Sequence, residues 1–159
     1  TEKMLSNKDA VHWIENKFSL SEKNKTKKLS KPISGKILFN YYIRNNPRHL
    51  WNSDLIPCSD NFYASHTKDK FPDLLAWFLL NSDQYLTYLL ASSRNQGSGL
   101  KKLQLYEYKE CLIPDWRILK PSNIQLGKEL AYEHIKASSS FSVVNRISTK
   151  FVSDNLNVS

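Results

Sequence analysis

The sequence contains few of the residues that build covalent frameworks or metal sites. Only two of its 159 residues are cysteines, Cys58 and Cys111, and they lie far apart. Without a secretory signal, two isolated cysteines are typical of reduced, buried thiols and do not indicate a disulfide framework. The four histidines show no paired spacing of the kind that binds zinc. We therefore expect a cytoplasmic location and no metal site.

Long apolar segments and catalytic motifs are also missing. No run approaches the ~18 apolar residues of a membrane-spanning helix, and no signal-peptide pattern opens the sequence. We find no phosphate-binding glycine loop, no nucleophile elbow and no zinc-binding helix motif. The carboxylates Asp54, Asp60, Glu107 and Glu110 are scattered, so no acid–base pair stands out. The sequence predicts no membrane span and no catalytic residue, and it favours a binding module.

What the sequence does contain is an excess of positive charge. Its 23 lysines and arginines exceed its 15 aspartates and glutamates, which gives a formal net charge of +8. A hydrophobic content of 40% with 12% aromatic residues indicates a chain that folds. The charge surplus favours phosphate contacts, because each neutralised phosphate releases counterions. Nucleic acid is therefore the favoured partner class, and an inert basic surface is the alternative.

The first 35 residues divide into an apolar and a basic part. Between residues 6 and 18, the apolar residues Val11, Ile14 and Phe18 recur near helical spacing, so a short helix is predicted. Residues 19–35 are polar and rich in lysine, which is typical of a loop or an exposed arm. We therefore interpret residues 1–35 as an N-terminal helix and a basic arm.

Strand signals follow this arm. Residues 36–44 are dense in β-branched and aromatic side chains, and they predict a central strand that is buried on both faces. Residues 45–48 have the composition of a turn, and residues 49–52 resume an extended run. This part of the chain therefore predicts a small sheet.

Helical signals dominate the remainder. Residues 71–93 predict two helices or one interrupted helix, because polar capping residues fall in the middle of an apolar stripe. After the glycine-containing turn at residues 97–99, a short helix or strand is followed by an apolar strand that ends at Pro114. Residues 122–138 predict a further helix, which Gly127 weakens.

The predicted fold class is α+β. It consists of a small, mainly antiparallel sheet with a helical hairpin and a C-terminal helix packed on one side. We expect residues 36–137 to form the folded unit. Residues 138–159 are rich in serine and asparagine, and we expect them to be a loosely ordered tail.

Three blocks of sequence carry a family resemblance. They are GKILFNYYIRNNPRHLWN, DNFYAS and LLAWFLLNSDQYLTYLLASSRNQGSGLKKLQLYEYKECLIPDW. In this order and spacing they resemble the C-terminal target-recognition domain of TaqI-type N6-adenine DNA methyltransferases and the related specificity domains of restriction-modification systems. The family's catalytic tetrapeptide and its S-adenosylmethionine loop do not occur in the sequence.

The resemblance implies that residues 36–137 are a target-recognition-like domain that binds double-stranded DNA. A catalytic methyltransferase domain of the same polypeptide would bind S-adenosylmethionine and flip the target adenine into its own pocket. The chain begins with Thr1 and not with methionine, which leads us to expect a fragment of such an enzyme. No cofactor is expected in the chain itself.

Six residues are predicted to contact DNA. They are Arg44, Arg48, Arg94, Asn95, Lys101 and Lys102. Arg44 and Arg48 bracket the turn after the predicted central strand, where they can bind phosphate or read guanine. The alternative is that they form surface salt bridges, for example with Asp54 or Asp60.

The lysine pair belongs to the second predicted contact region. Lys101 and Lys102 follow the turn at residues 97–99, whose glycines permit close approach of a phosphate chain. The alternatives are a solvated loop and glycines that serve folding alone. Four tyrosines alternate with apolar neighbours, namely Tyr41, Tyr42, Tyr106 and Tyr108. We predict that most of them lie in the core.

Two other functions remain open. The helical hairpin at residues 74–90 could dock a partner helix, which would make the chain a protein-interaction or assembly domain. The basic composition and aromatic residues also fit a small RNA-binding module that favours single strands.

Overall fold

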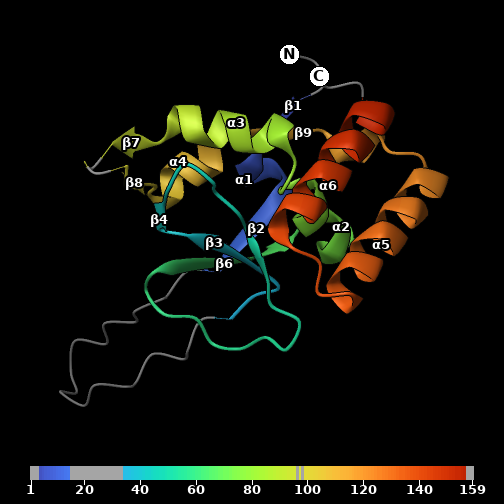
Figure 1. Ribbon diagram of the computed structural model, residues 1–159, viewed down its shortest axis with the longest axis horizontal. Coiled ribbons are helices and arrows are strands. Elements are labelled where there is room, and N and C mark those ends of the chain that lie inside the picture. The colour runs from blue at the N-terminus through green and yellow to red at the C-terminus, as the bar shows by residue number, and fades with distance from the viewer. Residues whose placement is uncertain (1–3, 15–33, 96, 98, 157–159) are drawn as a thin grey trace.

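The computed structural model describes residues 4–14, 34–95, 97 and 99–156, and these form an α+β domain, as predicted. Short antiparallel sheets pack against helices (Figure 1). The elements are β1 (Met4–Ser6), α1 (Asn7–Ala10), β2 (Val11–Ile14), β3 (Ile37–Asn40), β4 (Tyr42–Ile43), β5 (Leu50–Trp51), β6 (Phe62–Thr67), α2 (Asp73–Leu79), α3 (Asp83–Ser92), β7 (Arg94–Asn95), β8 (Lys101–Lys102), α4 (Leu105–Glu110), β9 (Leu112–Pro114), the 3₁₀ turn η1 (Trp116–Ile118), α5 (Pro121–Lys136) and α6 (Phe141–Leu156). No helix in the described part of the chain has the length and apolarity to cross a bilayer.

The largest sheet contains four antiparallel strands in the order β2-β6-β3-β5. β3 is an interior strand, because it pairs with β6 on one side and with β5 on the other. Ile37 and Phe39 are fully buried, whereas Leu38 and Asn40 are half-buried. The strand predicted at residues 36–44 is thus confirmed as interior. It is fully buried on one face only, and it is interrupted after Asn40.

The helix predicted between residues 6 and 18 is wrong for residues 11–14, and residues 15–18 lie outside the described part of the chain. α1 ends at Ala10, and the chain continues as β2, which pairs with β6. Val11 and Trp13 are buried while His12 is exposed, so burial follows the period of two that is typical of a strand. Short apolar segments fit both periods, and here pairing with β6 decides between them.

The helical hairpin is confirmed as two helices, α2 and α3, which separate at residues 80–82. The buried Asn81 fixes this break. Its amide oxygen accepts a hydrogen bond from the backbone N–H of His49 at 2.9 Å. Its amide nitrogen donates to the carbonyls of His49 at 3.2 Å and Trp77 at 2.9 Å. One side chain therefore ties the hairpin to the segment that leads into β5.

The tail that we expected to be loosely ordered contains the helix α6, so that expectation is wrong for residues 141–156. The buried residues of α6 recur at helical spacing and are Val144, Ser148, Phe151, Val152 and Leu156. α6 packs against α2, α3 and α5. The hydroxyl of Ser148 donates a hydrogen bond to the carbonyl of Phe78 in α2.

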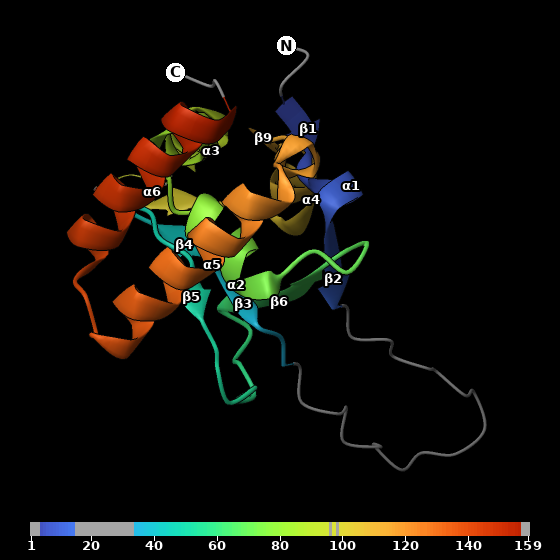
Figure 2. The same ribbon diagram turned by 90° about the vertical axis from the view of Figure 1, so that its right-hand side faces the viewer.

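At Gly127, α5 packs closely against both α2 and α6. A Cβ atom at this position would lie 2.6 Å from Cδ1 of Leu75 and 2.9 Å from Cζ of Phe151. The glycine that weakens the helix in isolation is therefore the point where α2, α5 and α6 meet. Figure 2 shows α5 and α6 side by side over α2.

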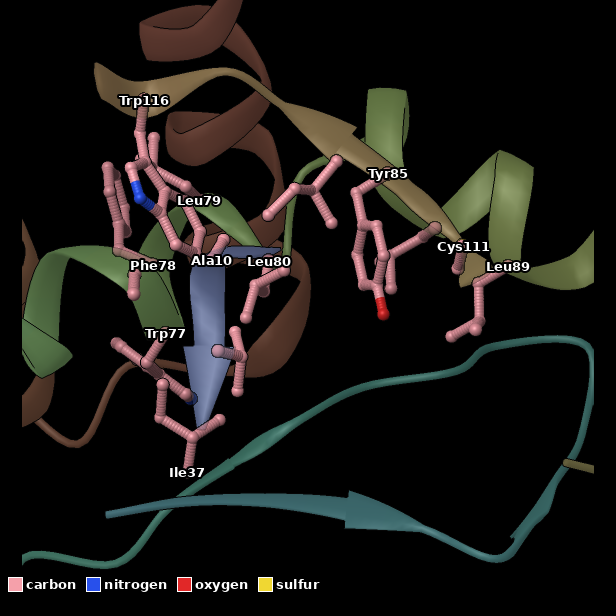
Figure 3. Close-up of a cluster of buried hydrophobic side chains, with 14 of the residues drawn as sticks. Ala10, Ile37, Trp77, Phe78, Leu79, Leu80, Tyr85, Leu89, Cys111 and Trp116 are labelled. Carbon is pink, nitrogen blue, oxygen red and sulfur yellow. The ribbon is translucent and has the colours of Figure 1, made fainter. Parts of the chain in front are cut away.

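The hydrophobic core joins residues that are far apart in the sequence (Figure 3). Ile37 of β3, Trp77 of α2 and Tyr85 of α3 are all buried in it. Both cysteines are free thiols, as expected, although only Cys111 is buried and Cys58 is half-buried.

Candidate nucleic-acid interface

The three-stranded sheet β4-β8-β7 brings the predicted contact residues together. β8 is its middle strand and pairs antiparallel with both neighbours. The two rows of paired residues are Tyr42–Lys102–Arg94 and Ile43–Lys101–Asn95. Arg44 directly follows β4. Five of the six predicted residues therefore lie in or beside one small sheet, at the end of α3 (Figure 1).

The glycines of the turn between β7 and β8 serve the chain reversal. Gly97 and Gly99 have φ angles of +83° and +72°, a region that favours glycine. The N–H of Leu100 donates to the carbonyl of Gly97 at 3.0 Å. Nothing in the described structure lies within 4 Å of a Cβ atom placed at either glycine. The lysine pair follows this turn as a paired strand and not as part of a loop.

The two lysines lie on opposite faces of β8, because successive side chains of a strand alternate. Lys101 shares its face with the buried Ile43, and its ammonium donates to the carbonyl of Leu90 in the last turn of α3 at 3.4 Å. Lys102 shares its face with Tyr42, which is 45% exposed. Lys101 therefore ties β8 to α3, and Lys102 belongs to the outer face.

A tyrosine supports the outer lysine. The ammonium of Lys102 lies 4.9 Å from the ring centroid of Tyr41, which is within range of a cation–π contact. Tyr41 packs edge-on against Tyr42 at 4.6 Å and Tyr63 at 6.0 Å between ring centroids. The hydroxyl of Tyr63 donates to the carbonyl of Leu103, and burial raises its pKa to about 12. Tyr63 is therefore a neutral donor that joins β6 to the residue after β8.

The aromatic residues of this region are more exposed than predicted. Of the four tyrosines assigned to the core, which all lie in the described part of the chain, Tyr108 alone is fully buried, and its hydroxyl donates to the carbonyl of Asn40. Tyr42 and Tyr106 are 45% and 50% exposed, and Tyr41 is half-buried. The assignment of most of these tyrosines to the core is therefore wrong. Cations interleaved with exposed aromatic rings are typical of surfaces that bind nucleic acids.

The two arginines of the predicted turn differ in their surroundings. Both Arg44 and Arg48 are exposed, and within the described residues neither forms an ion pair with Asp54 or Asp60. Arg44 adjoins the three-stranded sheet. Arg48 instead lines a pocket beside the connection between α5 and α6. The basic arm predicted at residues 19–35 lies outside the described residues up to residue 33.

Sequence reasoning missed the aromatic residues Trp51 and Trp77, which line this pocket together with Arg48. The ammonium of Lys36 lies 5.8 Å from the ring centroid of the pocket residue Trp51, and it donates to the carbonyl of Ser53. His134 reaches the same pocket from α5. No spacing signal could have found this group, because it joins segments that are far apart along the chain.

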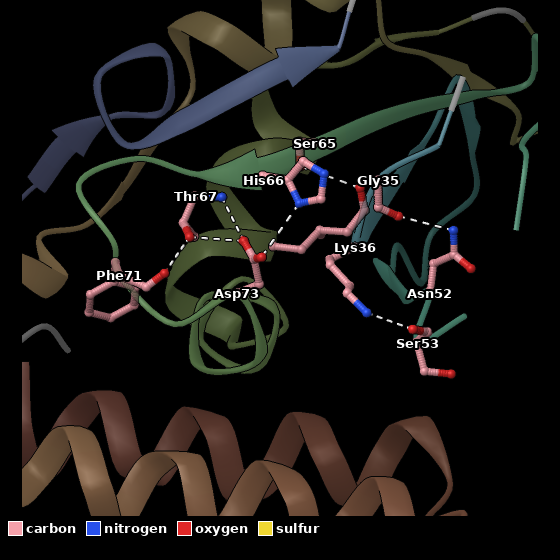
Figure 4. Close-up of polar contacts among 10 residues, drawn as sticks. Gly35, Lys36, Asn52, Ser53, Ser65, His66, Thr67, Phe71 and Asp73 are labelled. Carbon is pink, nitrogen blue, oxygen red and sulfur yellow. Dashed lines mark hydrogen bonds and ion pairs between the residues drawn. The ribbon is translucent and has the colours of Figure 1, made fainter. Parts of the chain in front are cut away.

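A second polar cluster joins β6 to α2 (Figure 4). Asp73 accepts hydrogen bonds from the backbone N–H of Thr67 at 2.7 Å and from its hydroxyl at 2.9 Å. His66 approaches the other oxygen of Asp73 at 3.4 Å. These contacts fix the start of α2. Within the described residues, no group of three or more histidine, cysteine or acidic side chains is arranged to hold a metal ion.

No protein-family model matches the chain, and none of the curated proteins matches it.

Proposed function

We propose that this domain binds double-stranded DNA through the outer face of β4-β8-β7 and positions it for N6-adenine methylation. The methylation would be carried out by a catalytic domain of the same polypeptide, which would bind the S-adenosylmethionine. The observation that carries the proposal is the register of β8, in which Lys102 pairs with Tyr42 of β4 on one side and with Arg94 of β7 on the other. Arg44 directly follows β4 and therefore adjoins this row. The proposed reaction follows from the family resemblance, and the arrangement of these residues supports the choice of surface.

The physical argument rests on positively charged side chains that the fold holds at this surface. Lys102 lies over the ring of Tyr41, and Arg44 is exposed at the end of β4. Exposed cations along a sheet can follow a phosphate chain, and the major groove admits a two-stranded antiparallel ribbon such as β7–β8. Exposed rings such as Tyr42 add contacts with sugar or base. The net charge of +8 draws a polyanion to the domain before these contacts form.

The protein-interaction alternative depends on the apolar stripe of the helical hairpin. Leu75, Phe78, Leu79 and Leu89 of that stripe are fully buried inside the domain. α5 and α6 pack against α2, and α6 also packs against α3. The hairpin therefore already has its partner helices within the chain. This burial favours a surface of charge and aromatic rings as the binding face.

The experiment is a titration of a fluorescent mixed-sequence duplex of about 20 base pairs across salt concentrations. We expect affinity to fall steeply with salt, with a log–log slope of several units. The variant Arg44→Gln/Lys102→Gln should reduce that slope by about one unit for each phosphate that the protein no longer neutralises. The matched control Lys120→Gln/Arg146→Gln removes the same charge from exposed positions of the helical side.

Three results would contradict the proposal. The first is a duplex affinity that does not depend on salt. The second is an equal loss of affinity in both double variants, because charge would then act without regard to position. The third is tighter binding of single-stranded RNA in direct competition, which would favour the RNA-binding module.

A further inference from the structure

A pocket of about 360 Å³ lies between the segment that leads into β5 and the connection from α5 to α6. Arg48 and Trp51 line one side, and His134, Ser139 and Phe141 line the other. Figure 2 shows β5 beside this connection. Small-molecule sites usually measure about 300–1,000 Å³, so the pocket is at the small end of that range.

The pocket is suited to a negatively charged ligand. Among the described residues that line it, none is acidic. Arg48 is exposed and makes no hydrogen bond or ion pair within the described part of the chain. An exposed guanidinium without a protein partner is suited to binding phosphate, because its N–H groups can donate two parallel hydrogen bonds to phosphate oxygens.

The same pocket has an aromatic wall. Trp77 is buried and fixed, because its indole N–H donates to the carbonyl of His49 at 2.9 Å. Trp51 is half-buried, and its ring centroid lies 6.2 Å from that of Trp77. An indole held in this way offers a planar surface on which a flat ligand can stack.

Polar groups complete the lining on the helical side. Nδ1 of His134 lies 2.9 Å from the hydroxyl of Ser139, and this contact orients the imidazole. The turn after α5 is tight, since Ser138 has a φ angle of +50° and Ser139 donates its N–H to the carbonyl of His134 at 2.9 Å. The pocket therefore presents an imidazole and hydroxyl groups opposite the tryptophans, and these can hydrogen-bond the edge of a planar ligand.

We propose that this pocket binds a nucleotide, with the base against Trp51 and the phosphate at Arg48. Cationic, aromatic and hydrogen-bonding groups converge there, and a nucleotide has a counterpart for each. The site goes beyond the duplex-binding surface, because it lies beside α5 and α6 and not on β4-β8-β7. The nucleotide could be free or could belong to an unpaired strand, and both sources present the same chemistry.

The test uses the full chain and adenosine 5′-monophosphate (AMP) as the probe. Binding is followed by quenching of tryptophan fluorescence and by calorimetry. We expect a dissociation constant on the order of 10 µM to 1 mM. Adenosine and ribose 5-phosphate, which each carry half of the ligand, should bind at least about tenfold more weakly. A short single-stranded oligonucleotide that binds more tightly than AMP would identify the strand as the source, and the reverse order would identify free nucleotide.

Arg48→Gln is the decisive variant, because Arg48 is exposed and its loss should leave the fold intact. We expect it to weaken AMP binding by at least about tenfold without a change in Tm. Trp51→Phe should remove much of the quenching signal while binding remains detectable by calorimetry. The control Lys120→Gln changes an exposed lysine at the opposite end of α5 from His134.

Any of three results would overturn the proposal. They are the absence of AMP binding at about 5 mM, unchanged binding by Arg48→Gln, and binding of an aromatic carboxylate as tight as that of AMP. The two proposals fail separately. If AMP does not bind but the salt-dependent binding of duplex DNA remains, only the pocket proposal fails.

Discussion

The imidazole ring of His49 lies 5.3 Å, centroid to centroid, from the ring of Tyr85 in the interior of the domain. The ring of Phe39 lies 4.3 Å away, and neither nitrogen of His49 has a hydrogen-bond partner among the described residues. Burial lowers the pKa of His49 from 6.5 to about 3, because a charged imidazole would lose its hydration. His49 is therefore neutral in the folded protein at neutral pH.

This buried histidine should make stability depend on pH. Below pH 6.5 the unfolded chain takes up a proton at His49, whereas the folded protein does not until about pH 3. The free energy of unfolding therefore falls as the pH falls through this window, by up to about 1.4 kcal/mol per pH unit. Urea denaturation at pH 7.5 and pH 5.0 should show a loss of about 2 kcal/mol.

The variant His49→Leu should remove most of that loss, because leucine does not titrate. The exposed His12 provides the control, and His12→Gln should retain it. An unchanged pH dependence in His49→Leu would contradict the role of this residue.

Gly127→Ala should destabilise the domain. At an exposed helix position this change stabilises by about 1 kcal/mol, because alanine is the better helix former. Here the added Cβ would lie 2.6 Å from Cδ1 of Leu75, so we expect a net loss of about 1–3 kcal/mol from overpacking. Thermal or urea denaturation measures it. Leu126→Ala, at a 47% exposed position of the same helix, should change stability by less than about 0.5 kcal/mol. A stabilised Gly127→Ala variant would show that the helices are not in close contact.

Asp73→Ala should destabilise the start of α2. The carboxylate accepts two hydrogen bonds from Thr67, and their loss leaves the partly buried N–H of Thr67 unpaired, whereas its hydroxyl can still donate to the carbonyl of Phe71. We expect a loss of about 1–3 kcal/mol in urea denaturation. Asp54→Ala removes an exposed carboxylate and serves as the comparison. Equal effects of the two substitutions would mean that the cluster in Figure 4 does not stabilise the fold.

The two cysteines should react at different rates with a thiol-reactive disulfide reagent such as DTNB. Cys111 is buried, and burial raises its pKa to about 12, so little thiolate forms and access is blocked. Cys58 is half-buried, and burial raises its pKa as well. We expect one thiol to react in the folded protein and two in urea. If the thiol that reacts in the folded protein is Cys58, the variant Cys58→Ser should lose this reaction. A reaction that persists in Cys58→Ser would contradict the assignment to Cys58.

Local periodicity was sufficient to predict much of the fold. The stripe in α2 and α3, the apolar strand before Pro114 and the helix α5 each fit one period over their whole length. Segments with a mixed pattern of apolar residues were harder to predict. β2 fits a helix and a strand equally, and its pairing with β6 decides the outcome. The apolar stripe of α6 was obscured by the serines and asparagines between its members, and its order depends on packing against α2.

The candidate interface was predictable in its residue types but not in its geometry. Charge and glycines pointed to Lys101 and Lys102, yet the sequence could not show that β4 and β7 flank them. Strand pairing between distant segments leaves no local signal. The pocket around Arg48 and Trp51 was not predicted for the same reason, because His134 belongs to α5, which is far from these residues in the sequence.

Hydrogen–deuterium exchange with and without duplex DNA tests the central claim most directly, because it reports where on the domain the DNA lies. We expect protection of the peptides that contain β4, Arg44 and the β7–β8 hairpin, with little change in α5 and α6. Protection that is confined to α5 and α6, or no protection at saturating DNA, would contradict binding through β4-β8-β7.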